Sequence, residues 1–188
     1  MAGATELETV VLRDMVRAFR NYKALGESAL AQVSDADLHA LVDPDANSIA
    51  IIVKHLAGNL RSRFADFLTS DGEKPDRDRD GEFEPDGVAA REDVMRAWQR
   101  GWTIALASID GLAPGDLQRT IHIRSEAFLV AEALNRSVTH TAYHVGQIVL
   151  LAKHFAGANW MSLSIPKGRS ADYVRGSFKQ GIIPGSAR

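Results

Sequence analysis

Two histidines, His140 and His144, stand four residues apart in the segment 137–147. In an α-helix this offset places both imidazoles on one face, about one turn apart. The same face carries apolar residues in steps of three and four, so the pair lies within the apolar stripe and not on the solvated side. Inward imidazoles need a partner, which can be a buried hydrogen-bond acceptor, a carboxylate or a metal ion.

A third histidine, His55, borders the apolar stripe of a separate helical segment, with Asn59 one turn further on. Two neutral imidazoles on one helix and a third from a facing helix can form a three-nitrogen metal site with positions open to water or substrate. The His-x-x-x-His spacing is a weak signal by itself. A pair of core histidines that is satisfied by hydrogen bonds therefore remains the alternative.

Several other metal chemistries are excluded by the residues around the histidine pair. Thr141 follows His140, so the glutamate of the His-Glu-x-x-His metalloprotease pattern is missing. No acidic residue lies between Asn135 and Gly157, which argues against a carboxylate-rich di-iron site. The chain has no cysteine, so thiolate ligands, cysteine nucleophiles and disulfides are absent.

The remaining histidines and polar neighbours have simpler interpretations. His39, His122 and His154 are expected to be structural or exposed residues. The neighbours of the candidate ligands are Asn59, Tyr143 and Gln147. The two amides can contact a bound water or each make an ordinary inter-helix contact. Tyr143 is expected to pack, with a role in supporting His144 as the alternative.

The composition predicts one soluble domain over residues 1–188. Hydrophobic residues make up 45% and charged residues 24%, ordinary values for a globular chain. The net charge of −2 does not indicate a nucleic-acid-binding protein. We find no signal-peptide pattern and no apolar run long enough to cross a membrane, so we expect a cytoplasmic protein without a membrane partner.

Apolar periodicity predicts an all-α fold, a four-helix bundle of up-and-down or crossover topology. The long helices are expected at about 6–32, from Asn47 or Ser48 to Thr69, at 89–109 and at 129–156. A short helical turn follows Ser34, and alternation around Arg124-Ser125 predicts one β-hairpin before the last helix.

Two segments lack a periodic pattern. The charge-alternating stretch 70–86 is expected to be a solvated connection, held down by Phe83, although its length also suits a lid or rim. Residues 158–188 are expected to be an irregular tail that packs on the bundle through Trp160, Leu163, Ile165 and Tyr173, with Trp160 largely buried.

Three segments, 47–59, 142–154 and 160–168, together resemble the DinB-like (YfiT-like) superfamily, and more narrowly a branch of it with no assigned function. The resemblance implies a four-helix bundle in which three histidines hold a divalent ion such as nickel or zinc. The superfamily's ligand positions fall on His55, His140 and His144. Characterised members include metal-dependent thiol transferases and a mycothiol-dependent isomerase, and dimers are common among them.

We therefore expect a divalent-metal-binding protein and most simply an enzyme. Thiol (S-) transfer with a low-molecular-weight thiol as substrate is the leading reaction, and hydrolysis is the second. The alternative is a non-catalytic metal-binding or stress-response bundle that binds a ligand. An open, polar space above the histidines would favour the enzyme.

A homodimer is also expected. The resemblance favours it, and two helices carry more apolar residues than one inward stripe needs. These residues are Val10, Val11, Leu12, Trp98 and Trp102.

Overall fold

The computed structural model of the chain describes residues 5–85 and 89–170. Within them the fold is mostly helical, with a small antiparallel hairpin before the last helix. The predicted anchor Tyr173 lies outside the described residues. The α-helices are α1 (Glu6–Leu30), α2 (Asp35–His39), α3 (Ile49–Phe64), α4 (Arg91–Asp110) and α5 (Val130–Ala156). The strands are β1 (Thr120–Ile123) and β2 (Glu126–Leu129), and short 3-10 turns are η1 (Gly81–Phe83), η2 (Pro114–Gln118) and η3 (Gly157–Asn159).

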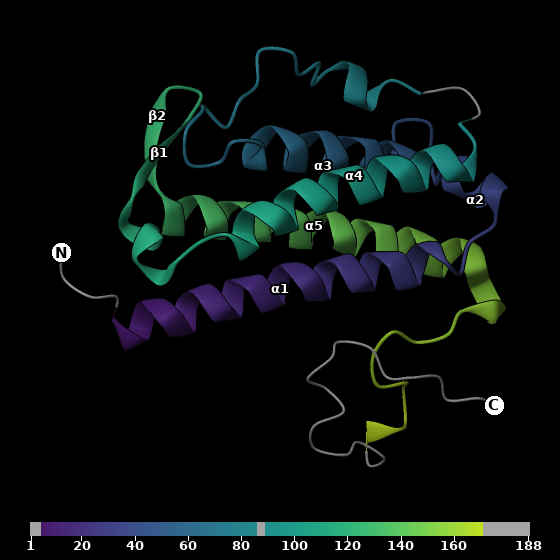
Figure 1. Ribbon diagram of the computed structural model, residues 1–188. Helices are drawn as coiled ribbons and strands as arrows, with labels where there is room; N and C mark the ends of the chain where they lie inside the picture. The colour runs from purple at the N-terminus through teal and green to yellow at the C-terminus, as the bar shows by residue number, and fades with distance from the viewer. Residues whose placement is uncertain (1–4, 86–88, 171–188) are drawn as a thin grey trace.

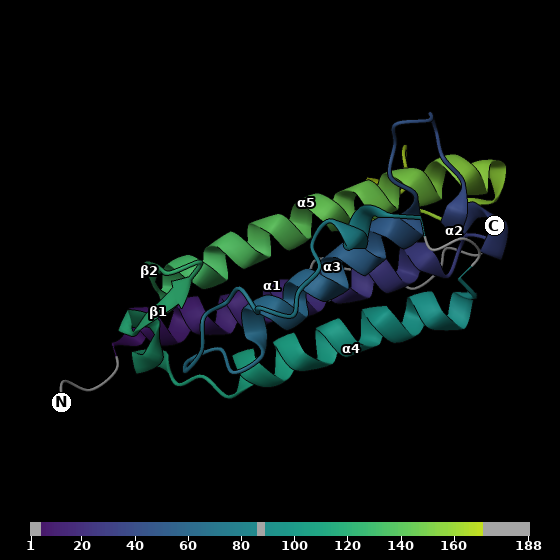
Figure 2. The ribbon, with the colours of Figure 1, turned by 90° about the horizontal axis from the view of Figure 1, so that it is seen from above.

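The four long helices lie side by side (Figures 1 and 2). α1 and α5 run in one direction, and α3 and α4 run in the other, so α3 is antiparallel to α5. Because α3 and α4 are parallel, the chain between them has to return along the length of α3. The segment 65–85, here called the crossover, makes that return above α3 and carries η1 (Figure 1). No described helix is long and apolar enough to cross a membrane.

Side-chain caps fix where several helices begin. The Ser48 hydroxyl accepts from the amide of Ile51 and starts α3, so of the two predicted caps, Asn47 and Ser48, the second is the one used. The predicted end of this helix at Thr69 is wrong, because α3 ends at Phe64. Asp66 adopts a left-handed backbone with φ of 50°, which no α-helix can continue. The chain therefore leaves the helical direction early and enters the crossover.

The core lies between the apolar faces of the long helices. Trp98 and Trp102 of α4 are fully buried within the single chain. They therefore need no second subunit to cover them, and this part of the apolar-surface argument for a dimer is wrong. Gly101 allows α4 to approach α3 closely, since a Cβ there would lie 2.8 Å from Cα of Ala57.

The predicted hairpin is confirmed, with Thr120 paired to Leu129 and Ile123 to Glu126. Arg124 and Ser125 form its two-residue turn, and both have positive φ (56° and 64°). Neither residue favours this conformation, so the turn needs outside support. The Asp71 carboxylate of the crossover supplies it by accepting from both turn amides at 2.8 Å.

The last helix ends as predicted at Ala156, before Gly157 with φ of 53°. The tail turns back onto the body, where the amide of Met161 donates to Gln32 of the chain just after α1. Trp160 packs against the core with most of its surface covered, as predicted. This segment lies at the periphery of the helices (Figure 1), where the indole packs on the core without being enclosed by it.

Candidate metal centre

The structure brings the three predicted histidines together. His140 and His144 project from successive turns of α5, and His55 comes from the antiparallel α3. The Nε2 atom of His140 lies 3.3 Å from Nε2 of His55 and 3.2 Å from Nε2 of His144. The candidate ligand atoms of the three rings all lie within 4.8 Å of one another, close enough to hold one metal ion.

The outer nitrogen of His55 is held by a residue that the sequence analysis did not select. Nδ1–H of His55 donates to Oε2 of Glu82 at 2.9 Å, and both side chains are buried. Glu82 lies in η1 of the crossover, and the ring of its neighbour Phe83 packs 4.6 Å from the His55 ring. Phe83 thus holds this segment down, as predicted, and its contact with His55 places the carboxylate of Glu82 behind the His55 imidazole.

Glu82 is ionised and fixed in place by Arg77. Nε and Nη2 of Arg77 donate to the two carboxylate oxygens, each at 2.8 Å. Burial alone would raise the pKa of Glu82, but the hydrogen bonds from Arg77 and His55 outweigh it and hold that pKa below its ordinary value. A charged, immobile carboxylate behind His55 fixes the ring orientation and makes its Nε2 a stronger donor to a cation.

His144 has an equivalent support on its own helix. Its Nδ1–H donates to Oε1 of Gln147 at 2.8 Å, one turn further along α5. This bond assigns the proton of His144 to Nδ1, as the bond to Glu82 does for His55. Both rings therefore direct an unprotonated Nε2 toward Nε2 of His140.

His140 completes a cluster that hydrogen bonds alone do not satisfy. Its Nδ1 is buried and has no partner among the described residues. If its proton lies on Nδ1, three Nε2 lone pairs face one another; if it lies on Nε2, it can be donated fully to only one of the two neighbours. A single cation at the convergence point would bind all three lone pairs, so the arrangement fits a metal ion better than it fits three structural histidines.

Two of the three distances between the ring nitrogens also fit. Zinc–nitrogen bonds of about 2.0–2.1 Å in tetrahedral geometry separate two ligand nitrogens by about 3.3 Å. The two observed Nε2–Nε2 separations of 3.3 and 3.2 Å agree with that value.

The electrostatics keep the rings of His140 and His144 neutral, the form that binds metal. Burial and then the imidazoles of His144 and His55 lower the pKa of His140 to about 3. Burial also lowers the pKa of His144, although its hydrogen bond to Gln147 acts in the opposite direction. At neutral pH protons therefore compete weakly with a cation for these two nitrogens.

A cavity of about 700 Å³ opens over the cluster, between the helices that carry the histidines. All three histidines line it, together with Asn59, Gln147 and several arginines. Tyr143 lines it as well, is largely exposed, and places its ring 4.8 Å from that of His144. The site thus has polar, accessible space above it and is not sealed.

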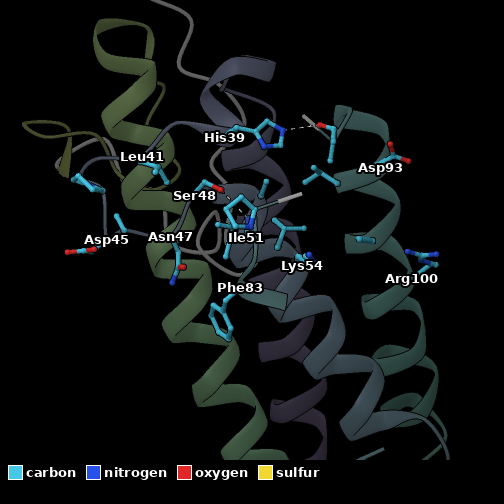
Figure 3. A pocket seen from close by; sticks show the side chains of 18 residues that line it. His39, Leu41, Asp45, Asn47, Ser48, Ile51, Lys54, Phe83, Asp93 and Arg100 are labelled. Atoms are coloured by element: carbon cyan, nitrogen blue, oxygen red, sulfur yellow. Dashed lines mark hydrogen bonds between the residues drawn. The ribbon is translucent and has the colours of Figure 1, made fainter. Parts of the chain in front are cut away.

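The other histidines lie apart from the cluster. His122 and His154 are exposed, and His39 donates from Nε2 to the carbonyl of Ala89 at 2.9 Å, so the prediction of structural or surface roles is confirmed. Figure 3 shows His39 and this bond at the rim of a second cavity, of about 540 Å³, at the α2 end of the helices. Among the described residues, the group of His55, His140 and His144 is the one with metal-binding geometry.

Glu82 is the main residue of the candidate site that sequence reasoning missed. The crossover contains an acidic residue at almost every second position, and nothing in that alternation distinguishes Glu82. The available signal was its place next to Phe83, the single large apolar residue of the charge-alternating stretch 70–86 and its predicted anchor.

Comparison with known proteins identifies a family but no activity. Searches of curated proteins and of solved structures found no match. The profile of one family, described as "Protein of unknown function (DUF1572)", matches residues 6–169, which include all three histidines and both supporting residues. The chain therefore belongs to the DUF1572 family.

Proposed function

We propose that His55, His140 and His144 hold one divalent metal ion, nickel or zinc, and that the protein is a metal-dependent enzyme acting on a small molecule. The observation that carries the proposal is the convergence of the three Nε2 atoms. The Nδ1 atoms of His55 and His144 are each held by a hydrogen-bond acceptor, and Nδ1 of His140 has no partner among the described residues. In the same proposal the four long helices form a four-helix bundle of the DinB-like superfamily. The parallel pair α3 and α4, joined by the crossover, is the crossover variant of that bundle.

A divalent ion held by three neutral imidazoles would act as a Lewis acid and lower the pKa of a thiol or water in the cavity. S-transfer from a low-molecular-weight thiol is the leading reaction, because the resemblance to DinB-like proteins includes thiol transferases. Hydrolysis is the second candidate. An open cavity lined by polar groups supports an enzyme over a closed structural site.

The chain's own residues have distinct tasks in this proposal. Glu82 and Gln147 hold two imidazoles in the tautomer that presents Nε2 to the cavity. Phe83 covers one face of the His55 ring and keeps water from it. Asn59, buried but lining the cavity, offers an amide to a substrate polar group. These groups bind and orient, and none of them is in position to act as a strong general base.

The test is a screen of low-molecular-weight thiols with electrophilic acceptors, using metal-loaded protein and protein stripped with a chelator. We expect thiol consumption that the chelator abolishes and that added nickel or zinc restores. His140→Ala should lack this activity, whereas His122→Ala, a matched change at an exposed histidine of β1, should retain it. Activity that is unchanged by chelation and by His140→Ala would refute the proposal.

A further inference from the structure

The cavity over the histidines is strongly cationic. Five arginines line it, and its lining contains no acidic side chain. They come from α3, the crossover, the hairpin turn and α5, namely Arg63, Arg77, Arg79, Arg124 and Arg136. We infer that this cavity binds a small anionic ligand through a carboxylate or phosphate group, and that Arg136 and Arg79 hold its charge. The inference rests on the proposed function, since it names the substrate class of the same site.

The positive charge is only partly neutralised by the protein. The carboxylate of Glu73 pairs with Arg63, Arg77 and Arg124, and that of Glu82 pairs with Arg77. Five guanidinium groups less these two carboxylates leave three positive charges at the cavity, and the exposed carboxylate of Asp80 pairs with one of them, Arg79. Low-dielectric walls concentrate such a field and attract a counter-ion of opposite sign.

Arg136 and Arg79 are the arginines with free hydrogen-bonding edges. Arg136 stacks over the Phe128 ring at 5.5 Å, and within the described residues no carboxylate pairs with it. Arg79 stacks over Phe83 at 5.3 Å, and its 3.6 Å contact with Asp80 involves a carboxylate that is 99% exposed. Stacking on an aromatic face orients a guanidinium while its in-plane N–H groups remain available for an oxyanion.

Two buried polar side chains in the same cavity also lack a partner. Asn59 (9% exposed) and Ser137 (5% exposed) both line it. Neither side chain makes a hydrogen bond to another described residue. Their polar atoms are not fully enclosed by protein, so these two side chains are free to bind a group that enters the cavity. Asn59 lies one turn from His55, and Ser137 lies three residues before His140, so both lie beside the imidazoles.

The arrangement gives the ligand a direction. On α5, Arg136 precedes His140 by one turn and adjoins Ser137, and on α3, Arg63 lies one turn beyond Asn59. Because α3 and α5 are antiparallel, both arginines lie on the hairpin side of the histidines. The anionic end of a ligand would contact Arg136, while its other polar groups would reach Asn59, Ser137 and the imidazoles. About 700 Å³ is ample for such a molecule.

The experiment is a calorimetric titration with two probes, succinate and inorganic phosphate, into zinc-loaded and metal-free protein. Arg136→Gln removes the proposed contact. Arg17→Gln is the control, because it makes the same charge change on the exposed surface of α1, where Arg17 pairs with Asp14. Succinamide, a neutral analogue of succinate, tests whether charge is what the cavity recognises.

We expect at least one anion to bind wild-type protein, and the tighter of the two identifies the anionic group. Arg136→Gln should weaken that binding about tenfold or more, as expected for loss of a charge-assisted contact. Arg17→Gln should not, and both variants should bind zinc like wild type. The inference is overturned if neither anion binds, if Arg136→Gln binds as tightly as wild type, or if succinamide binds equally well.

The proposed metal site and the proposed anion site can be refuted independently of each other. Zinc binding without anion binding would overturn the anionic ligand and leave the metal site standing. Binding of an anion that depends on Arg136 in a protein that takes up no zinc would support the anion site and remove the proposed metal-dependent function.

Discussion

Replacing Gly58 by alanine separates the role of Glu82 from any change in charge. Gly58 lies in the middle of α3, where alanine is ordinarily favoured over glycine by about 1 kcal/mol. A Cβ at this position, however, would overlap Oε1 of Glu82 and lie 2.7 Å from its Cδ. The carboxylate can move away only by leaving Arg77 and His55, which hold it with three hydrogen bonds of 2.8, 2.8 and 2.9 Å.

The expected magnitude follows from those bonds. Loss of one hydrogen bond to a charged group costs about 1.5–3 kcal/mol, which exceeds the gain of about 1 kcal/mol in helix propensity. Gly58→Ala should therefore lower the free energy of unfolding of the metal-free protein by about 0.5–2 kcal/mol. Displacing the carboxylate behind His55 should also weaken zinc binding about 10–100-fold.

Gly146→Ala is the matched control. Gly146 is also inside a helix, lies between His144 and Gln147 in the sequence, and has open space where a Cβ would be. We expect this variant to raise the free energy of unfolding by about 0.5–1 kcal/mol and to bind zinc like wild type. Urea denaturation with chelator and calorimetric zinc titration measure both quantities. If Gly58→Ala behaves like Gly146→Ala in both assays, Glu82 does not support the site as described.

Three further predictions concern other parts of the structure. The pKa of His140 is about 3 in the folded metal-free protein against 6.5 for a free side chain, so the unfolded chain binds more protons between these values. Stability should therefore fall as the pH drops below 6.5, and less steeply in His140→Gln, as urea denaturation at several pH values will measure. Gly101→Ala should destabilise by about 1–3 kcal/mol, because its Cβ would press on the backbone of Ala57, and a normal urea midpoint would refute this close contact. We still propose a homodimer, now from exposed Leu7 and Val10 of α1; light scattering should give twice 20.5 kDa, and a mass of 20.5 kDa means a monomer.

Much of the helical framework could be predicted because its signals are local. Helical periodicity, the Ser48 cap and Gly157 mark where segments begin or end, and the two-residue spacing around Arg124-Ser125 indicates a hairpin. The end of α3 could not be predicted. The stretch after Phe64 remains apolar enough for a helix, and it is the left-handed conformation of Asp66 that turns the chain away.

The histidine cluster could be predicted because each member lies on an apolar helix face, where a polar ring needs a partner. The support of His55 could not be, because it depends on how the crossover returns along α3. That path depends on long-range contacts, such as the bonds between Asp71 and the hairpin turn.

The central claim, that three specific nitrogens bind one metal ion, is tested most directly by ¹H–¹⁵N NMR of the histidine side chains during a zinc titration. Before zinc is added, His55 and His144 should show the Nδ1–H tautomer. One equivalent of zinc should then shift the Nε2 resonances of these two rings and of His140, and should leave the other three histidines unchanged. The claim is contradicted if zinc shifts none of the three, shifts a different set, or coordinates through Nδ1 of His55 or His144.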